Sequence, residues 1–294
     1  MKTKNLIGMM AMAIAMAGCQ KETGEVTEEV NIEPIQDKIS ITFSVGGDFE
    51  LTSLKAMSRG LAADGKDMTD LWVMDYVGGA LVQQLHQTSG DEGFGSPTIA
   101  LDYGSHHLYF VCSRGTGPTL STDEHKITWA TTSDTFYKDY GVEVTSGSAT
   151  SRNVTLERVA TKLRISILDQ IPEGTAKIEL TPATWYYGID YISGEPTSAI
   201  SAGKREINIP SQYIGTTGEV TTSIFGISSA TEWTTDVSIV ARNGSDEVLG
   251  QATITDAPFV ANRVTNYSGN LFSAGGSFAL MLSTTWAEEY NGTW

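Results

Sequence analysis

The sequence predicts an all-β protein built from two β-sandwiches. Short apolar runs alternate with Gly, Ser, Thr, Asp and Pro along most of the chain, and sustained helical periodicity is scarce. Many short strands separated by turn residues are typical of antiparallel sandwiches. Residues 145–151 are rich in Ser, Thr and Gly and have no apolar face, so they predict a break between two halves of comparable size.

Three runs show strand alternation most clearly. In each, apolar side chains recur at every second position and therefore share one face. These positions are Leu163, Ile165 and Ile167 in "KLRISIL", Val237, Ile239 and Ala241 in "TDVSIVA", and Phe278, Leu280 and Leu282 in "SFALML". Two connections, "STDEHKI" (121–127) and "TSDTFYKDYG" (132–141), could instead hold short helices.

The first eighteen residues have the pattern of a signal peptide. Lys2 and Lys4 precede an apolar run that is too short to span a bilayer as a stable helix. The run ends in "AMAGC", which resembles a bacterial lipobox and predicts acylation of Cys19, with the acyl chains as a membrane anchor. The alternative is an ordinary signal peptide with an incidental cysteine. Residues 19–37 are acidic and poor in aromatic residues, which predicts a tether.

The charge balance excludes a nucleic-acid partner. The chain has 35 Asp and Glu against 19 Lys and Arg, a net charge of -16, whereas binding to nucleic acid needs a basic surface. Once Cys19 is acylated, Cys112 is the one cysteine left, and an intramolecular disulfide cannot form. Cys112 lies in an apolar strand and is expected to be a buried small hydrophobe; a reactive thiol is the alternative.

No catalytic or metal-binding motif stands out, so we expect no enzyme and no cofactor. His106 and His107 are adjacent on an expected strand, and their side chains point to opposite faces. Asp123 and Glu124 are imaginable as a pair of glycosidase carboxylates, but such pairs are common in acidic proteins. Trp185, Tyr186 and Tyr187 could line a sugar site, although aromatic residues in strands more often belong to a core.

Three segments together resemble the fimbrillin family, the type V pilus subunit lipoproteins of Bacteroidales. They are "MSRGLAADGKDMTDLWVMDY", "LERVATKLRISILD" and "NRVTNYSGNLF", in this order along the chain. The resemblance implies two tandem transthyretin-like β-sandwich domains, here residues 38–150 and 151–294. It also implies a structural subunit of a cell-surface fimbria that mediates adhesion and biofilm formation, located in the outer membrane and then in the fimbria.

Basic residues of these segments have two readings. Arg158 and Lys162 flank the expected junction, and Arg263 lies on a late strand. They could hold the two sandwiches together through hydrogen bonds to loops, or they could be solvated strand residues.

The loop around Arg59 suggests a route of assembly by strand exchange. It is polar and rich in glycine, as sites of proteolysis are, and cleavage between Arg59 and Gly60 would release the preceding strand "ISITFSV" together with the lipid. The C-terminal segment could then complete a neighbouring subunit by strand addition. Its candidate donor side chains are Phe278, Leu280, Leu282 and Trp286. The alternative keeps both strands in their own sheets and leaves Arg59 solvated.

Two further functions remain open. The chain could be an anchor or accessory subunit that keeps its lipid, or a surface lipoprotein that binds a glycan or another host or bacterial surface ligand. For a fimbrial subunit, the expected partners are other pilus subunits.

Overall fold

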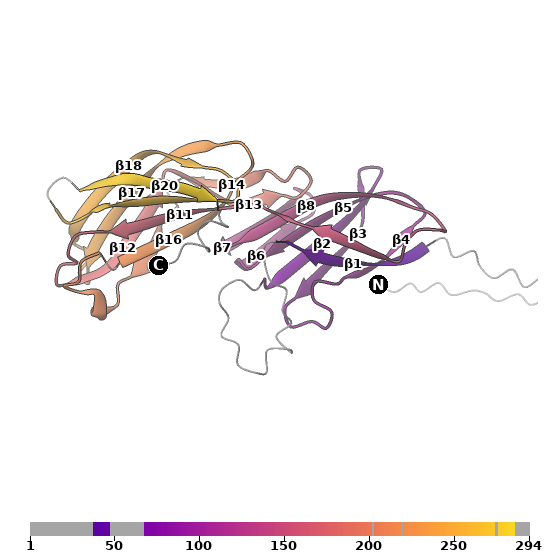
Figure 1. Cartoon of the computed structure of the whole chain (residues 1–294), viewed down its shortest axis with the longest axis horizontal. Coiled ribbons are helices and arrows are strands. Elements are labelled where there is room, and N and C mark those ends of the chain that lie inside the picture. Colours follow the sequence, from indigo (N-terminus) through magenta and orange to yellow (C-terminus); the bar gives the residue numbers. More distant parts are fainter. Residues whose placement is uncertain (1–37, 48–67, 202, 219, 274–275, 286–294) are drawn as a thin grey trace, which may run out of the picture. The chain divides into compact units, whose positions relative to one another are not determined.

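The computed structural model describes residues 38–47, 68–201, 203–218, 220–273 and 276–285 (Figure 1). This part of the chain is all-β, apart from one short 3-10 helix at Ser211–Tyr213. The all-β prediction is confirmed.

Two sheets form the first sandwich. The outer sheet has the order β4-β1-β9, and the central sheet has the order β10-β8-β5-β2-β3. The outer sheet consists of β1 (Lys38–Gly46), β4 (Thr98–Asp102) and β9 (Ser151–Thr155). The central sheet consists of β2 (Asp70–Val77), β3 (Ala80–Thr88), β5 (Gly104–Ser113), β8 (Thr135–Val144) and β10 (Glu157–Arg158).

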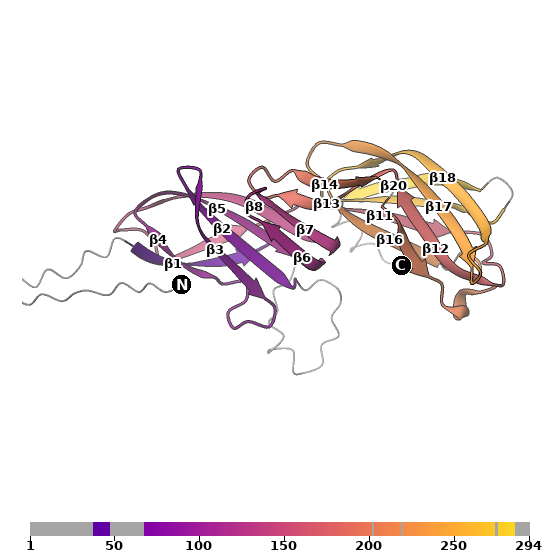
Figure 2. The ribbon, with the colours of Figure 1, turned by 180° about the vertical axis from the view of Figure 1, so that it is seen from behind.

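The second sandwich also has two sheets, seen from behind in Figure 2. The β11 sheet has the order β16-β11-β19-β20, and the β12 sheet has the order β15-β12-β17-β18. The strands of the β11 sheet are β11 (Ala160–Ile167), β16 (Val220–Ile227), β19 (Arg263–Asn270) and β20 (Ser277–Thr285). Those of the β12 sheet are β12 (Thr175–Pro182), β15 (Arg205–Asn208), β17 (Trp233–Asn243) and β18 (Val248–Phe259).

A fifth sheet contains one hairpin from each half of the chain. Its order is β14-β13-β7-β6, and we call it the shared sheet. It consists of β6 (Thr116–Ser121), β7 (Lys126–Thr131), β13 (Thr184–Asp190) and β14 (Pro196–Ser201). The two hairpins join where Gly188 pairs with Thr128, and a Cβ at Gly188 would lie 2.9 Å from Cγ2 of Thr128. Glycine at this position therefore permits the close approach of the two strands.

The central sheet is buried on both faces. One face packs on the outer sheet and includes Leu71 and Val73; the other, with Trp72 and Met74, belongs to a cluster that includes Ile189 of the shared sheet. This double burial explains why "DLWVMDYV" is an almost continuous apolar run.

One buried carboxylate interrupts this run. Asp75 lies 2.8 Å from Nδ1 of His106 and accepts a hydrogen bond of 2.9 Å from Nε2 of Gln83. Nε2 of His106 in turn lies 3.0 Å from the carbonyl oxygen of Asp102. Both polar side chains of the buried pair are thus supplied with partners, as burial requires.

The alternating runs have the predicted burial. Leu163, Ile165 and Ile167 are completely buried in the core of the second sandwich, together with Val237, Ile239 and Ala241 of β17. Cys112 is a free, fully buried thiol whose pKa is raised by burial, so the prediction of a small core hydrophobe is confirmed.

The prediction of short helices in two connections is wrong. Residues Thr122–His125 form a turn before β7, and residues Thr135–Gly141 are part of β8, which pairs with β5. The aromatic residue Phe136 is buried in the core of the first sandwich, and this tertiary contact favours the strand.

Strand pairing shows which strands near the junction belong to each sandwich. Strand β9 pairs with β1, and β10 pairs with β8, so both lie within the first sandwich. The domain boundary at residue 150 stays a prediction. The first strand of the second sandwich is β11, which begins at Ala160.

Arg158 connects the two sandwiches at this junction. Its Nε and Nη2 donate to the two carboxylate oxygens of Asp134 at 2.7 and 3.1 Å, and its Nη1 donates to Oδ1 of Asn262 at 3.0 Å. Asn262 precedes β19 of the second sandwich, so the predicted junction role of Arg158 is confirmed. Lys162 lies 5.3 Å from the ring centroid of Phe225, and Arg263 is exposed.

We expect Arg158→Met to destabilise the protein by about 3–5 kcal/mol, because it leaves the carboxylate of Asp134 buried without its cation. The two side chains are 3% and 5% exposed. Urea unfolding followed by tryptophan fluorescence measures the effect. Arg263→Gln, on an exposed residue, is the matched control and should change stability by less than about 0.5 kcal/mol. A loss below about 1 kcal/mol for Arg158→Met would contradict the role of this ion pair.

Candidate assembly site

Strand β1 fills the middle of the outer sheet. It pairs antiparallel with β4 and parallel with β9. Its backbone also donates from Phe43 to the carbonyl of Pro97 at 2.9 Å, and its Gly46 carbonyl accepts from Leu156 at 2.8 Å. Both edges of β1 are therefore hydrogen-bonded.

The inner face of β1 closes the core of the first sandwich. Ile41, Phe43 and Val45 are buried, at the strand spacing that "ISITFSV" predicts. The ring of Phe43 lies 5.6 Å from that of Phe110 and 6.0 Å from that of Tyr140. Three apolar side chains at positions i, i+2 and i+4 thus occupy the groove between β4 and β9.

Strand β20 lies at the edge of the β11 sheet. Within the described residues it pairs with β19 alone, with Gly269 opposite Phe278 and Tyr267 opposite Leu280. Phe278 is half-buried and packs against the core of the second sandwich. One edge of β20 is therefore hydrogen-bonded, whereas β1 is bonded at both.

Glycine allows β20 to approach its neighbours. A Cβ on Gly269 would collide with the carbonyl oxygen of Ser277 and would lie 2.6 Å from Cα of Phe278. A Cβ on Gly276 would lie 2.6 Å from the carbonyl oxygen of Gln251. Both positions require glycine for packing.

A carboxylate fixes the chain between β19 and β20. Asp169 accepts hydrogen bonds from the backbone N–H groups of Leu271, Phe272 and Ser273 at 3.0, 2.7 and 3.0 Å. Partial burial of the carboxylate raises its pKa, but these hydrogen bonds outweigh burial and hold the pKa of Asp169 below its usual range. The turn leading to β20 is therefore anchored to the segment that follows β11.

The predicted site residues are only partly covered by the structure. Cys19, Arg59, Gly60 and Trp286 lie outside the described residues. Phe278, Leu280 and Leu282 all lie on β20. The structure places all three on one strand of the chain's own sheet, but a register shift between the pairs Tyr267–Leu280 and Asn266–Leu282 interrupts the predicted alternation there. The assignment of β20 as a donor strand stays a prediction.

The aromatic run of β13 belongs largely to the core. Trp185 is buried, its Nε1 donates to the carbonyl of Phe225 at 2.9 Å, and its ring lies 5.0 Å from that of Phe259. Tyr186 packs against Trp233 at 5.2 Å. The core interpretation is thus correct for Trp185.

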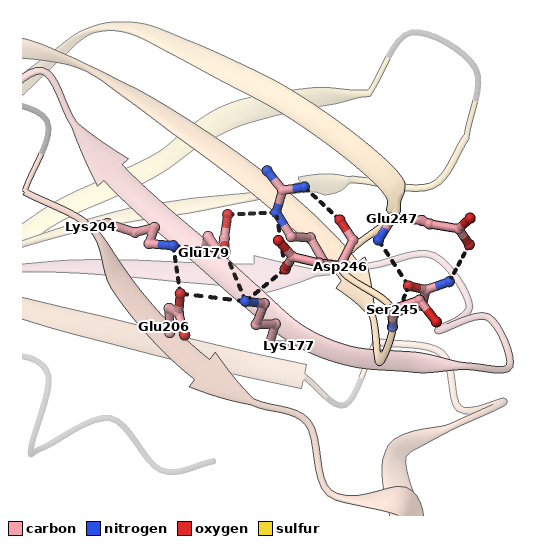
Figure 3. A network of polar contacts seen from close by, with 9 residues as sticks. Lys177, Glu179, Lys204, Glu206, Ser245, Asp246 and Glu247 are labelled. Atoms are coloured by element: carbon pink, nitrogen blue, oxygen red, sulfur yellow. Dashed lines mark hydrogen bonds and ion pairs between the residues drawn. The ribbon is translucent and has the colours of Figure 1, made fainter.

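A network of charged side chains crosses the β12 sheet (Figure 3). This network was not predicted from the sequence. Glu179, 4% exposed, accepts hydrogen bonds from Arg242 Nε at 2.8 Å and from Lys204 Nζ at 3.1 Å, and it lies 3.2 Å from Lys177 Nζ. Arg242 and these lysines lower the pKa of Glu179 to about 2. These residues come from neighbouring strands and the chain before β15, so no local sequence motif predicts the network.

Two features are absent from the described residues. No group of three or more His, Cys, Asp or Glu side chains in this part of the chain could hold a metal ion. Nor does any helix within the described ranges have the length and apolar character needed to cross a bilayer.

Comparison with known proteins finds similar structures. No family model matches the sequence, and no curated protein matches it. One similar structure, from Bacteroides thetaiotaomicron, is of proteins proposed to bind polysaccharides; it has a TM-score of 0.50 at 9% identity and covers 84% of this chain and 95% of that chain. A proposed adhesin of Bacteroides ovatus has a TM-score of 0.49 at 10% identity and covers 85% of this chain and 95% of that chain.

A third similar structure is the tip fimbrial protein Mfa3 of Porphyromonas gingivalis, with a C-terminal truncation. Its TM-score is 0.45 at 14% identity, and the match covers 85% of this chain and 100% of that chain. Identities this low concern the fold alone. The fold that the resemblance to the fimbrillin family implies, an all-β chain of sandwiches, is confirmed.

We expect Gly269→Val to loosen β20 from β19, because the added side chain collides with the backbone of Ser277. Overpacking of this kind costs about 1–3 kcal/mol. Hydrogen exchange should show faster exchange of the amides of β20. Gly244→Val is the matched control, since nothing lies within 4 Å of a Cβ at Gly244. Unchanged protection of β20 in the Gly269 variant would show that close packing does not hold the strand.

We expect Glu179→Gln to lower the free energy of unfolding at pH 7 by about 2 kcal/mol, through the loss of hydrogen bonds to charged groups. The folded-state pKa of about 2 lies below the ordinary value of about 4.3. The contribution of Glu179 is thus complete above about pH 4.3 and is lost as the pH falls towards 2.

The difference between wild type and Glu179→Gln, measured by urea unfolding, should therefore be constant at neutral pH and should shrink between about pH 4 and pH 2. Glu157→Gln is the control, since that side chain is 77% exposed in its pair with Lys138. A difference that persists unchanged at pH 2 would contradict the assignment.

Proposed function

We propose that this chain is a structural subunit of a cell-surface fimbria and takes part in adhesion and biofilm formation. It is exported as a lipoprotein precursor, with Cys19 acylated and inserted in the outer membrane. Cleavage between Arg59 and Gly60 then removes β1 and the lipid, and the subunit joins the fimbria. This role is structural and not enzymatic.

The observation that carries the proposal is the match between β1 and β20. The groove of β1 accepts apolar side chains at i, i+2 and i+4, namely Ile41, Phe43 and Val45. The sequence of β20 presents apolar residues at the same spacing, and these are Phe278, Leu280 and Leu282. A β20 strand from another subunit can therefore supply the same series of side chains that β1 supplies.

Loss of β1 creates a need for such a strand. Removing it leaves β4 and β9 with unpaired backbone groups and uncovers the partners of Phe43. Each fully buried side chain of this size contributes about 1.5–3 kcal/mol. Neighbouring strands lie about 4.8 Å apart, so the gap between β4 and β9 is about one strand wide. Strand addition from a second subunit restores both the pairing and the core.

Two other roles are compatible with the same fold. A subunit that keeps Cys19 and its lipid would serve as the anchor or an accessory subunit of the fimbria. Alternatively, the chain is a surface lipoprotein that binds a glycan or another host or bacterial ligand. The N-terminus of the mature protein distinguishes both of these roles from the polymerising subunit, because polymerisation by this route requires a chain that starts at Gly60.

The test is mass spectrometry of the N-terminus of the protein taken from native cells, together with electrophoresis of detergent-resistant polymers. We expect wild type to begin at Gly60 and to form polymers. Arg59→Ala should retain lipidated Cys19 and remain monomeric, and deletion of residues 277–294 should be cleaved but not polymerise. Lys55→Ala, in the same loop, is the control and should behave as wild type.

Polymers formed by Arg59→Ala or by the deletion variant would overturn strand exchange by this route. A wild-type protein that retains lipidated Cys19 would support the anchor or the ligand-binding lipoprotein.

A further inference from the structure

A pocket lies where the shared sheet meets the β11 sheet. Its volume is about 320 Å³. Its wall comes from β6, β7 and the residues that flank this hairpin, from β13 and β14, from the start of β15 and the chain before it, and from β16. The walls thus come from both halves of the chain. The volume suits a small-molecule ligand.

The pocket is cationic in an acidic protein. Arg114, Lys204 and Arg205 line it, and none of its lining residues is Asp or Glu. The whole chain carries a net charge of -16. A local surplus of cations in such a chain favours an anionic ligand.

Lys204 does not supply this surplus. Its Nζ lies 3.1 Å from Glu179 and also pairs with Glu206, so carboxylates already compensate its charge. Among the described residues, neither Arg114 nor Arg205 forms an ion pair. Arg205 donates from Nη1 to Oγ1 of Thr131 at 3.4 Å and is exposed. The two arginines are therefore the cations available to a ligand.

Arg114 is held in place with hydrogen-bonding capacity to spare. Its Nε donates to Oγ of Ser133 at 3.2 Å, and its backbone N–H donates to the carbonyl of Asp134 at 3.2 Å. Its Nη1 is buried and has no partner among the described residues. A buried donor left unpaired is unfavourable, and an acceptor brought by a small adjustment around a ligand would offset that cost.

The turn that carries Arg114 leaves little room for rearrangement. A Cβ on the next residue, Gly115, would lie 2.5 Å from Cδ1 of Trp129. Gly115 also donates from its backbone to Oγ of Ser113 at 3.0 Å. The position of Arg114 is thus fixed before any ligand arrives, which lowers the entropic cost of binding.

The rest of the lining combines aromatic side chains with hydroxyl groups. Trp185, Tyr187 and Phe225 provide the aromatic part. The hydroxyl groups are those of Thr116, Thr131, Thr132, Ser133, Tyr187 and Ser223. A sugar ring has an apolar face that packs on aromatic rings and a rim of hydroxyl groups that need hydrogen-bonding partners.

We propose that this pocket binds a carboxylate-bearing sugar residue, such as a uronic or sialic acid, at an acidic surface glycan. The guanidinium groups of Arg114 and Arg205 receive the carboxylate, because guanidinium matches the geometry of a carboxylate. The hydroxyl-rich wall favours a saccharide over an acidic peptide. The site is separate from β1 and β20, so this inference does not depend on strand exchange.

Isothermal titration calorimetry of the purified protein with N-acetylneuraminic acid and with glucuronic acid tests the inference. We expect at least one of them to bind, with glucose and acetate each at least tenfold weaker than that sugar. Arg114→Gln and Arg205→Gln should each weaken binding by about tenfold or more, as expected for loss of a charge-assisted contact. Arg263→Gln removes the same charge from an exposed position and should leave binding unchanged.

Several outcomes would overturn the proposal. They are no binding of either acidic sugar, equal binding of glucose or acetate, tighter binding of an Asp- and Glu-containing tripeptide, or unchanged affinity in both arginine variants. Near-ultraviolet circular dichroism establishes that each variant is folded. If Arg114→Gln does not fold, the affinity of the Arg205→Gln variant alone tests the proposal, because Arg205 is exposed.

Discussion

The pairing of β7 with β13 is the contact on which the remaining architecture depends. It joins a hairpin of the first half to a hairpin of the second and so makes the shared sheet. Ile127 and Ile189, which pair in this sheet, then cover the face of the central sheet that carries Trp72 and Tyr109. Without this cover, large aromatic side chains of β2 and β5 would face water. Residues of β7 and β13 also line the pocket that contains Arg114.

Much of the fold follows from the sequence because a strand with one buried face has a period of two. Leu163, Ile165 and Ile167 obey that rule and are buried as predicted. The shared sheet could not be predicted from the sequence, because periodicity identifies a strand but not the strand that it pairs with. The central strand β2 cannot be predicted by alternation, because it is buried on both faces. Its buried Asp75 is explained only by partners on other strands, Gln83 and His106. The helix expected in residues 132–141 failed for a related reason, since the packing of Phe136 outweighed a weak local preference.

The candidate sites differ in how well they can be predicted from the sequence. The apolar series Phe278, Leu280, Leu282 is contiguous and can be read directly. The cationic pocket cannot, since Arg114, Arg205 and Tyr187 are brought together only by folding. The same holds for Glu179: Lys177 lies on its own strand, but Lys204 and Arg242 approach it from other segments. The sequence offered a hint only at Trp185–Tyr187: both Trp185 and Tyr187 line the pocket, although Trp185 is largely buried in the core as well.

Strands β1 and β20 differ in their number of hydrogen-bonded neighbours, and this difference favours the proposed movement of β20 into the place of β1. As an edge strand, β20 has one hydrogen-bonded neighbour among the described strands, whereas the place of β1 offers two. A strand that moves from an edge into such a groove gains backbone partners and buries a second row of contacts. Asp169 holds the backbone at Leu271, Phe272 and Ser273, so the donor segment would leave its own sheet from a fixed point after Ser273. In the proposed route, cleavage would determine when exchange occurs, because the groove is closed for as long as Phe43 and its neighbours fill it. In this scheme the precursor stays monomeric because its own β1 competes intramolecularly, at high effective concentration, with any strand from a second subunit.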